Sequence, residues 1–296
     1  MTASFWNALM PSEPVLSRII VDGIPTRVLE AGRCSPTEND ETVILIHGAS
    51  GHLESFIFTV PVLAQTWRTI AFDLPFHGYA GYADHPYSVP EYARYLSSLA
   101  EVLGVGKVSL VGQSLGGAIA ARATVNGLLD VQRLVLIGSV GWSDGAGGAQ
   151  STMRAALTDR SREVVRARLE HAMSCRGPHM DELVECRYHA YQRGNWQQRL
   201  DAFTHHETPD GRRQALLSDE EWRAIRCPAL LIWGDQDVVV PAATGEALAS
   251  LIPHSRLMIV SGAGHNPQFE LPDQVNTAIA DFLGGTISLG KADPSG

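Results

Sequence analysis

Short apolar runs, each ending at a turn residue, recur along the chain. They are continuous rather than alternating, which is typical of strands buried on both faces and therefore of a parallel sheet. Stretches with helical periodicity separate most of these runs, so we predict an α/β fold with a mostly parallel central sheet flanked by helices. The predicted strands cover residues 42–46, 69–72, 108–111, 134–137, 229–233 and 257–260, and the predicted helices cover residues 89–103, 115–126, 242–251 and 272–282.

The N-terminal region has a different pattern. Residues 17–31 hold two apolar stretches on either side of Asp22-Gly23. An Asp-Gly pair favours a tight hairpin turn, because glycine adopts positive φ without strain. We therefore expect a β-hairpin ahead of the first parallel strand.

The strand pattern is interrupted between residues 142 and 226, where helical, charged stretches replace the buried runs. The clearest of these stretches are residues 161–173 and 180–193. We interpret the segment as a mainly helical insertion folded over the edge of the sheet. The chain then divides into a first core part (1–141), a helical cap (142–226) and a second core part (227–296), whose last residues, 288–296, form a polar, frayed tail.

Composition narrows the class of protein. Of the 296 residues, 45% are hydrophobic and 19% charged, so the chain can bury a substantial core. The formal net charge of −9 gives no general attraction to nucleic acid or to an anionic membrane, and no run approaches the ~20 apolar residues of a membrane span. The start of the chain lacks the basic residues and the long apolar run of a secretory signal.

The spacing of the cysteines and histidines indicates neither a redox-active cysteine pair nor a metal site. The four cysteines are far apart and form no Cys-x-x-Cys pair, as expected of a reduced, cytoplasmic protein. Five histidines lie between positions 171 and 206, but their spacing matches no common zinc pattern, so we expect no metal site. The sequence leaves the oligomeric state open between a monomer and a homodimer.

The strongest chemical signal is a Gly-x-Ser-x-Gly motif, Gly112-Gln113-Ser114-Leu115-Gly116, placed directly after a predicted strand and before a predicted helix. A serine in such a tight turn has strained backbone angles, and glycines two positions away leave room for it. The following helix favours negative charge near its N-terminus. This context makes Ser114 the candidate nucleophile, against the simpler interpretation of a glycine-rich turn.

A serine hydroxyl needs a base, and the base needs a group that orients it. His265 follows one predicted strand in a glycine-flanked turn, and Asp235 and Asp237 follow another. The order serine, aspartate, histidine along the chain is that of one hydrolase architecture. All lie after the carboxyl ends of strands, where α/β sheets build their sites. We predict a catalytic triad of Ser114, His265 and one of the two aspartates.

The oxyanion that forms when a serine attacks a carbonyl needs preorganised hydrogen-bond donors. One is expected from the backbone N–H of Leu115, directly after the nucleophile. The other is expected from the turn of small residues after the first parallel strand, where we favour Ala49 over Ser50. We interpret His47, at the start of the same turn, as a structural residue rather than a proton carrier.

Together these motifs resemble the α/β-hydrolase superfamily over residues 42–283. The resemblance rests on Ile46-His47-Gly48, on the serine motif, and on the turns at residues 233–237 and 262–265. It implies that Asp237 rather than Asp235 orients His265, that the insertion is a cap domain, and that the reaction needs no metal or organic cofactor. A serine at this turn disfavours the epoxide hydrolases and haloalkane dehalogenases, which carry an aspartate there.

Within the superfamily, the cap segment 180–193 is similar to that of the meta-cleavage-product hydrolases. These enzymes hydrolyse a carbon–carbon bond in the vinylogous 1,5-diketones that form when catechol rings are opened. The resemblance implies that Arg187 faces the active site, where its fixed fork of donors would bind the anionic substrate. The alternative is that Arg187 makes a surface ion pair with an acidic residue of its own helix, Asp181, Glu182 or Glu185.

Several positions depart from that family's pattern. Gln113 stands where many members have asparagine, Asn266 stands where many have an aromatic residue, and residues 48–54 replace a more glycine-rich loop. Gln113, Asn266 and Ser50 are still candidates for hydrogen bonds to a polar substrate. Trp142 either lines an aromatic substrate pocket or packs between the cap and the core.

The sequence therefore predicts a serine hydrolase that cleaves a carbon–carbon bond in a dienol product of aromatic ring cleavage. Two alternatives stay open. The first is a carboxylesterase or lactonase with the same triad, which would cleave a nitrophenyl ester faster than a ring-cleavage product. The second is a non-catalytic ligand receptor on this fold, which would show slow single-turnover hydrolysis and retain its product tightly.

Overall fold

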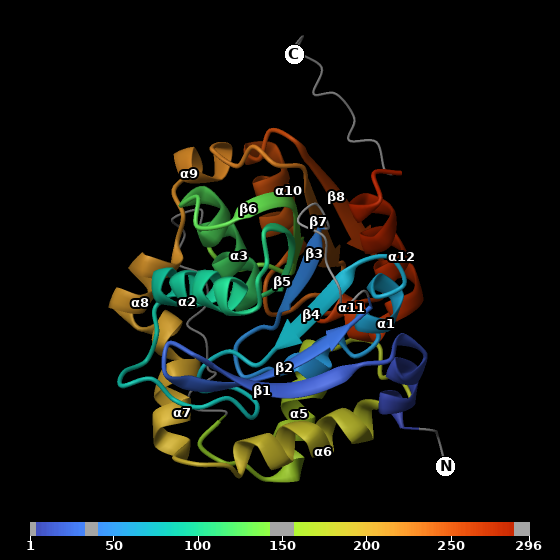
Figure 1. The fold of residues 1–296 in the computed structure, drawn as a ribbon. Helices are drawn as coiled ribbons and strands as arrows, with labels where there is room; N and C mark the ends of the chain where they lie inside the picture. The colour runs from blue at the N-terminus through green and yellow to red at the C-terminus, as the bar shows by residue number, and fades with distance from the viewer. Residues whose placement is uncertain (1–3, 33–40, 143–156, 287–296) are drawn as a thin grey trace.

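The centre of the molecule is an eight-stranded sheet (Figure 1). The computed structural model describes residues 4–32, 41–142 and 157–286, so the tail predicted at 288–296 lies outside the described residues. The strands are β1 (Val15–Val21), β2 (Ile24–Ala31), β3 (Thr42–Ile46), β4 (Arg68–Phe72), β5 (Lys107–Gln113), β6 (Asp130–Ile137), β7 (Ala229–Gly234) and β8 (Ser255–Val260). They are ordered β1-β2-β4-β3-β5-β6-β7-β8. Pairing is antiparallel between β1, β2 and β4 and parallel from β4 to β8, which confirms the predicted fold class.

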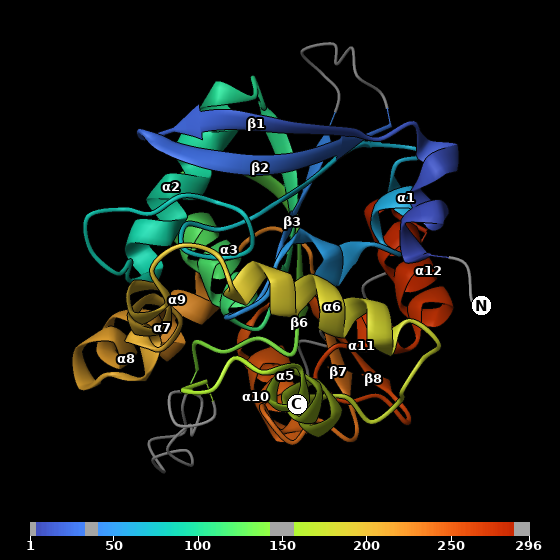
Figure 2. The same cartoon turned by 90° about the horizontal axis from the view of Figure 1, so that it is seen from below.

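Helices cover both faces of this sheet. The core helices are η1 (Phe5–Ser12), η2 (Leu53–Phe56), α1 (Val60–Leu63), α2 (Val89–Val102), α3 (Leu115–Val125), α10 (Ala242–Leu251), α11 (Pro267–Glu270) and α12 (Pro272–Leu283). Side chains of α2, α3 and α10 share one apolar cluster, and those of η1, α1 and α12 share another (Figures 1 and 2). The sheet lies between the two clusters.

The strand β3 shows why the apolar runs of the sequence are continuous. All five of its residues are buried. Ile44 and Ile46 belong to the cluster on the α2–α3 face, whereas Val43 and Leu45 belong to the cluster on the α1–α12 face. Because successive side chains of a strand point to opposite faces, a strand covered on both sides needs an apolar residue at every position.

The N-terminal hairpin forms as predicted. β1 and β2 pair from Val15↔Glu30 to Val21↔Ile24. Asp22 and Gly23 connect the two strands, with φ of 47° and 76°. Positive φ at both central residues is the signature of the two-residue turn that suits the twist of a hairpin.

Between β6 and β7, the described residues from 157 onward are mainly helical. It contains α5 (Arg162–Ala172), α6 (Met180–Tyr191), α7 (Trp196–Phe203), η3 (His205–Glu207), α8 (Pro209–Ala215) and α9 (Asp219–Arg223). α5 and α6 agree with the stretches predicted at 161–173 and 180–193, and the Ser161 hydroxyl accepts a hydrogen bond from the Val164 N–H at the start of α5. The exact domain boundaries at 141/142 and 226/227 stay a prediction.

The helices α5 to α7 lie across the carboxyl ends of the strands (Figure 2). The Tyr191 hydroxyl donates to the Ser50 carbonyl oxygen, which follows β3, at 3.1 Å. The Arg199 guanidinium donates to the Gly78 carbonyl oxygen, which follows β4, at 3.0 Å. We expected the insertion at the edge of the sheet. These helices instead cover the carboxyl ends of the parallel strands and the loops that follow them.

The rest of the inserted segment packs against the body of the molecule. α8 contacts α2, and α9 contacts α3 and α10. Trp222 of α9 is fully buried in the cluster on that face of the sheet. In the described ranges, no helix has both the length and the apolar character that crossing a bilayer requires.

Candidate active site

Ser114 occupies the turn between β5 and α3. Its backbone has φ 52° and ψ −116°, a region that non-glycine residues rarely adopt and that stores strain. Hydrogen bonds hold the turn: the Ser114 N–H donates to the Ile137 carbonyl oxygen at 2.9 Å, and the Ser114 carbonyl oxygen accepts from the Val140 N–H at 3.3 Å. The turn therefore has the strand-to-helix context and the strain that the motif predicts.

His265 and Asp237 are in direct contact. The Asp237 Oδ2 atom lies 2.8 Å from His265 Nδ1, and Asp237 Oδ1 accepts from the N–H groups of Val239 and Val240 at 2.9 Å each. Both side chains are almost completely buried. The aspartate is therefore fixed by its own turn and presents one oxygen to the imidazole.

Asp235 takes no part in this contact. Its carboxylate accepts from the Gly262 N–H at 2.7 Å and from the Ser261 hydroxyl at 3.1 Å, which joins the loops after β7 and β8. Of the two aspartates left open by the residue pattern, Asp237 is the one that touches His265, in agreement with the family resemblance.

Loops after five strands, β3, β5, β6, β7 and β8, meet around Ser114 and His265. The Gln113 side-chain amide donates to the His265 carbonyl oxygen at 3.0 Å. A Cβ atom added at Gly48, after β3, would lie 3.0 Å from Ser114 Cβ. One added at Gly138, after β6, would lie 3.1 Å from His265 Nδ1 and 3.2 Å from Asp237 Oδ2. The predicted residues therefore gather at the carboxyl end of the sheet, where glycines allow the loops to approach closely.

The backbone N–H groups predicted to bind the oxyanion have no hydrogen-bond acceptor in the described part of the chain. Across residues 4–32, 41–142 and 157–286, the N–H groups of Ala49, Ser50 and Leu115 donate to no protein acceptor. Leu115 is the first residue of α3, so its N–H belongs to the first turn of the helix, where no intrahelical partner exists. Ser50 has φ 58°, and its carbonyl oxygen accepts from the Tyr191 hydroxyl of α6. These amides are available to a ligand oxygen.

Arg187 on α6 is a half-buried side chain whose Nε is fully buried and, among the described residues, has no hydrogen-bond partner. Burial lowers the pKa of its guanidinium. The acidic residues of α6 pair elsewhere: Asp181 with Arg166 at 2.6 Å, Glu182 with the Phe5 N–H at 2.7 Å, and Glu185 with Arg162 at 2.7 Å. The surface ion pair that we considered for Arg187 is absent from the part of the chain that the structure describes.

The other substrate-binding candidates have different surroundings. The Trp142 indole N–H donates to Asp219 at 3.2 Å, and its ring packs beside the cluster on the α2–α3 face, so its observed contacts are those of cap–core packing. The Gln113 side-chain amide N–H donates to the His265 carbonyl oxygen. Asn266 caps α11 and donates its backbone N–H to Glu270 at 3.0 Å. A substrate role for these three side chains stays a prediction.

His47 is locked as a neutral ring. Its Nδ1–H donates to the Gly48 carbonyl oxygen at 2.8 Å, and its Nε2 accepts from the Leu74 N–H at 3.1 Å, a pattern that only the neutral tautomer allows. Burial lowers its pKa to about 4. This geometry fits the structural role that the sequence suggested for His47.

Acid should therefore destabilise the fold through His47. The unfolded chain binds a proton at this ring near pH 6.5, whereas the folded chain does so only near pH 4. The stabilising contribution is complete above pH 6.5 and falls progressively toward pH 4, by up to about 3 kcal/mol. Urea unfolding of wild type and His47→Gln across this range measures it: we expect a shallower pH dependence in the variant, and identical slopes would contradict the assignment.

Glu270, which is not among the site residues predicted from the sequence, holds the loop of His265 in place. Its buried carboxylate accepts from the N–H groups of Gly264 at 2.9 Å and Asn266 at 3.0 Å, on either side of His265. The same carboxylate accepts from Ser174 at 2.8 Å and Cys175 at 2.9 Å, just after α5. No motif announces this residue, because its partners are backbone amides far away in the sequence.

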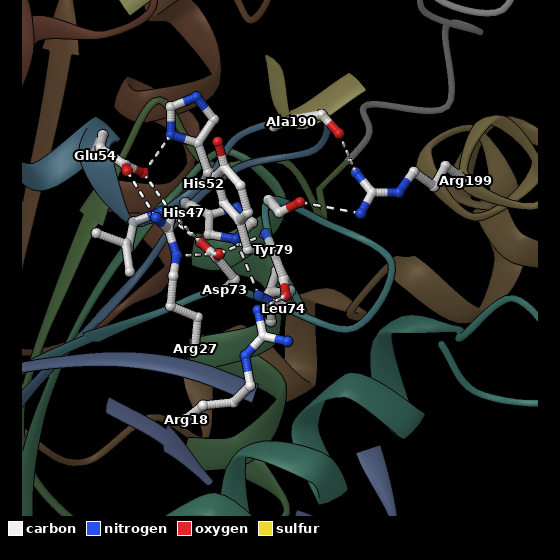
Figure 3. Close-up of polar contacts among 12 residues, drawn as sticks. Arg18, Arg27, His47, His52, Glu54, Asp73, Leu74, Tyr79, Ala190 and Arg199 are labelled. Atoms are coloured by element: carbon white, nitrogen blue, oxygen red, sulfur yellow. Dashed lines mark hydrogen bonds and ion pairs between the residues drawn. The ribbon is translucent and has the colours of Figure 1, made fainter. Parts of the chain in front are cut away.

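A second buried network lies under α6 (Figure 3). Arg27 of β2 donates to both oxygens of Glu54, at 2.9 and 2.7 Å, and to both oxygens of Asp73, at 2.7 and 3.2 Å. His52 Nδ1 lies 2.7 Å from Glu54 Oε2. The sequence showed only that residues 48–54 are atypical. In the described residues no group of three or more acidic, histidine or cysteine side chains is placed to hold a metal ion.

Comparison with known proteins supplies the family. A model of the alpha/beta hydrolase fold matches residues 41–272. The chain is 28% identical, over 90% of its length and 68% of the relative's, to the dihydrolipoyllysine-residue acetyltransferase component of the acetoin cleaving system of Cupriavidus necator. It is 27% identical to 2-hydroxymuconate semialdehyde hydrolase of Pseudomonas putida, over 96% and 99% of the two chains. A solved meta-cleavage product hydrolase of Pseudomonas fluorescens shares the fold with a TM-score of 0.80 and 24% identity, over 92% and 98%.

Proposed function

Because the chain belongs to the alpha/beta hydrolase fold family, we propose that it hydrolyses a carbon–carbon bond in a dienol ring-cleavage product, using Ser114, His265 and Asp237. The contact between Asp237 Oδ2 and His265 Nδ1 at 2.8 Å carries the proposal, because it orients the other ring nitrogen toward a proton donor. The similarity to meta-cleavage-product hydrolases, which the comparisons confirm, supports the choice of bond.

In the proposed mechanism, the dienol substrate is first converted to its keto form: the proton of its hydroxyl group is lost and the carbon beside the scissile carbonyl gains one, with Arg187 and His265 as the participating residues. His265 then takes the proton of Ser114 as the hydroxyl oxygen attacks the keto carbonyl. The N–H groups of Leu115 and Ala49 bind the oxygen that becomes negative. Asp237 keeps Nδ1 protonated and stabilises the imidazolium that forms.

The carbon–carbon bond then breaks, and its electron pair stays on the leaving fragment as a dienolate. That carbanionic fragment takes the proton from His265. His265 next removes a proton from water, whose oxygen attacks the acyl-serine, and the acid leaves as Ser114 Oγ regains a proton. One water is consumed, and a carboxylic acid and a dienol are the products.

The experiment that tests the proposal is a substrate panel with the purified protein. It compares 2-hydroxymuconate semialdehyde, a ring-cleavage product with a phenyl end group, and 4-nitrophenyl acetate. We expect the yellow dienol to be bleached with a higher kcat/KM than the ester. The reverse order would assign the protein as a carboxylesterase, and a single turnover with retained product would assign it as a receptor.

Arg187 is expected to separate the two kinds of substrate. Arg187 is half-buried and its fully buried Nε has no partner among the described residues, which favours an anionic ligand, because a charged group that is partly removed from water is costly without a partner. Arg187→Ala should lower kcat/KM on the anionic dienol by about 10- to 100-fold, the range of one charged hydrogen bond. Activity on 4-nitrophenyl acetate should change little, and equal losses on both substrates would count against this role.

A further inference from the structure

A pocket of ≈ 350 Å³ lies between the N-terminal hairpin, the loop after β4 and the turn that joins α6 to α7. Among the described residues, its lining contains three arginines and no aspartate or glutamate, although the whole chain has a net charge of −9. None of these lining residues belongs to the proposed triad or to the predicted oxyanion donors, and Arg187 is not one of them. The pocket is therefore a positively charged concave surface that the proposed mechanism does not use.

Two of the three arginines reach the same residue from different elements. Arg18 of β1 donates to the Tyr79 carbonyl oxygen at 3.2 Å. Arg193, in the turn after α6, lies over the Tyr79 ring with its Cζ atom 4.9 Å from the ring centroid. One arginine of the core and one of the cap therefore meet at the loop after β4.

Arg199 of α7 is the buried member of the set, with 1% of its surface exposed. Its guanidinium donates to the Gly78 and Ala190 carbonyl oxygens at 3.0 and 2.8 Å and to the Tyr82 hydroxyl at 2.9 Å. Figure 3 shows Arg18 and Arg199 pointing toward the loop after β4 from two sides. All three acceptors of Arg199 are neutral, and in the described ranges no carboxylate lies within ion-pair distance of it. A buried charge without a counterion is costly, so an anion in the pocket would stabilise the protein.

The two exposed arginines also lack a carboxylate partner. In the part of the chain that the structure describes, Arg193 makes no hydrogen bond or ion pair, and Arg18 donates only to the Tyr79 carbonyl oxygen. Other exposed arginines of the cap behave differently: Arg162 and Arg166 each form an ion pair with a carboxylate of α6, at 2.7 and 2.6 Å. The donors of the pocket are thus available to a ligand.

The loop that gathers the arginines is held firmly. Asp73 accepts from the Tyr79 N–H at 2.7 Å, and the Gly81 N–H donates to the Pro25 carbonyl oxygen at 2.7 Å. The Asp73 carboxylate itself is paired with Arg27 at 2.7 Å, on the side of the loop that faces the buried network. The pocket is therefore formed before a ligand arrives, which reduces the entropy lost on binding.

We propose that this pocket binds the phosphate group of a small organic molecule, with Arg18, Arg193 and Arg199 as its donors. A phosphate monoester carries up to two negative charges and three strong acceptor oxygens, which suits three guanidinium groups better than one carboxylate does. A volume of ≈ 350 Å³ lies within the range of small-molecule sites, about 300–1,000 Å³, and leaves room for the organic part. Because Arg18 belongs to the core and the other two arginines to the cap, the bound ligand joins these two parts.

Calorimetric titration with glycerol 3-phosphate at about pH 8, where the phosphate is a dianion, tests the site. Ionic strength is held constant with sodium chloride, and succinate is titrated as a dicarboxylate for comparison. We expect saturable binding of glycerol 3-phosphate, and binding of succinate that is weaker by about tenfold. Arg18→Gln and Arg193→Gln should each weaken phosphate binding by about tenfold, the effect of one charged hydrogen bond.

The matched control is Arg256→Gln, which removes an exposed arginine from β8, the strand at the other edge of the sheet. It should leave the affinity within about twofold of wild type, because a distant exposed charge is screened by salt. Glycerol 3-phosphate should also raise the thermal unfolding midpoint of wild type above that in sodium chloride of equal ionic strength, because it binds the native state. This rise should disappear when Arg18→Gln and Arg193→Gln are combined, and the midpoint without ligand shows that the double variant is folded.

Arg187→Ala distinguishes this pocket from the proposed active site, and it should leave the affinity for glycerol 3-phosphate unchanged. Loss of binding in Arg187→Ala with full binding in the double variant would place the anion in the active site and overturn the proposal. No saturable binding by wild type, tighter binding of succinate, or an equal loss in Arg256→Gln would also overturn it. None of these measurements depends on turnover, so the site can be tested even if the proposed carbon–carbon cleavage fails.

Discussion

Ser114→Ala is expected to reduce turnover of every substrate by about 10⁴-fold or more, because removal of the nucleophile from a serine–histidine–aspartate triad removes the whole covalent route. The backbone strain at φ 52° is the same for alanine as for serine, so the elbow should keep its shape. The measurement is initial rates at high enzyme concentration, together with the thermal unfolding midpoint.

The control for this variant is Ser109→Ala, which alters a buried serine of the preceding strand, β5, whose hydroxyl donates to Glu41. It should keep nearly full activity. A Ser114→Ala protein that folds normally and retains near wild-type rates would eliminate the nucleophile and with it the proposed mechanism.

Gly116→Ala is expected to have the largest effect on folding. A Cβ atom at Gly116 would overlap the backbone of β3, because its position falls on the Ile46 carbonyl group and lies 2.8 Å from the His47 carbonyl oxygen. Backbone atoms of a central strand cannot move aside without breaking the sheet. We expect a loss of about 3 kcal/mol or more in the free energy of unfolding, measured by urea denaturation, or no soluble protein at all.

Gly106→Ala serves as the comparison, because a Cβ atom there meets nothing within 4 Å and its φ is not positive. That change should leave stability within about 0.5 kcal/mol of wild type. A stable Gly116→Ala protein with full activity would contradict the close approach of α3 to β3. The second glycine of the motif is thus explained by packing rather than by backbone conformation.

Much of the fold could be predicted because strands that are buried on both faces appear in the sequence as continuous apolar runs. Every residue of β3 and β7 is buried and most of them are apolar, and the turn residues that follow mark where each strand ends. The same turns carry Ser114, Asp237 and His265, so predicting the strands also placed these side chains at one end of the sheet.

Other parts of the site could not be predicted, because their partners are distant in the sequence. Glu270 is recognised only by the amides that surround it, two of them just after α5. Arg27 sits in a hairpin strand and pairs with residues 27 and 46 positions later. Asp235 and Asp237 are equivalent by spacing alone, and only the position of the His265 ring distinguishes them.

The carboxylate of Glu270 connects the cap to the loop that carries His265. It accepts from amides just after α5 and from amides on both sides of His265, and the His265 N–H itself donates to the Ala172 carbonyl oxygen at the end of α5. A displacement of this end of the cap would therefore move the imidazole relative to Ser114. The position of the proposed base thus depends on how the end of α5 is seated, although that helix carries none of the three triad residues.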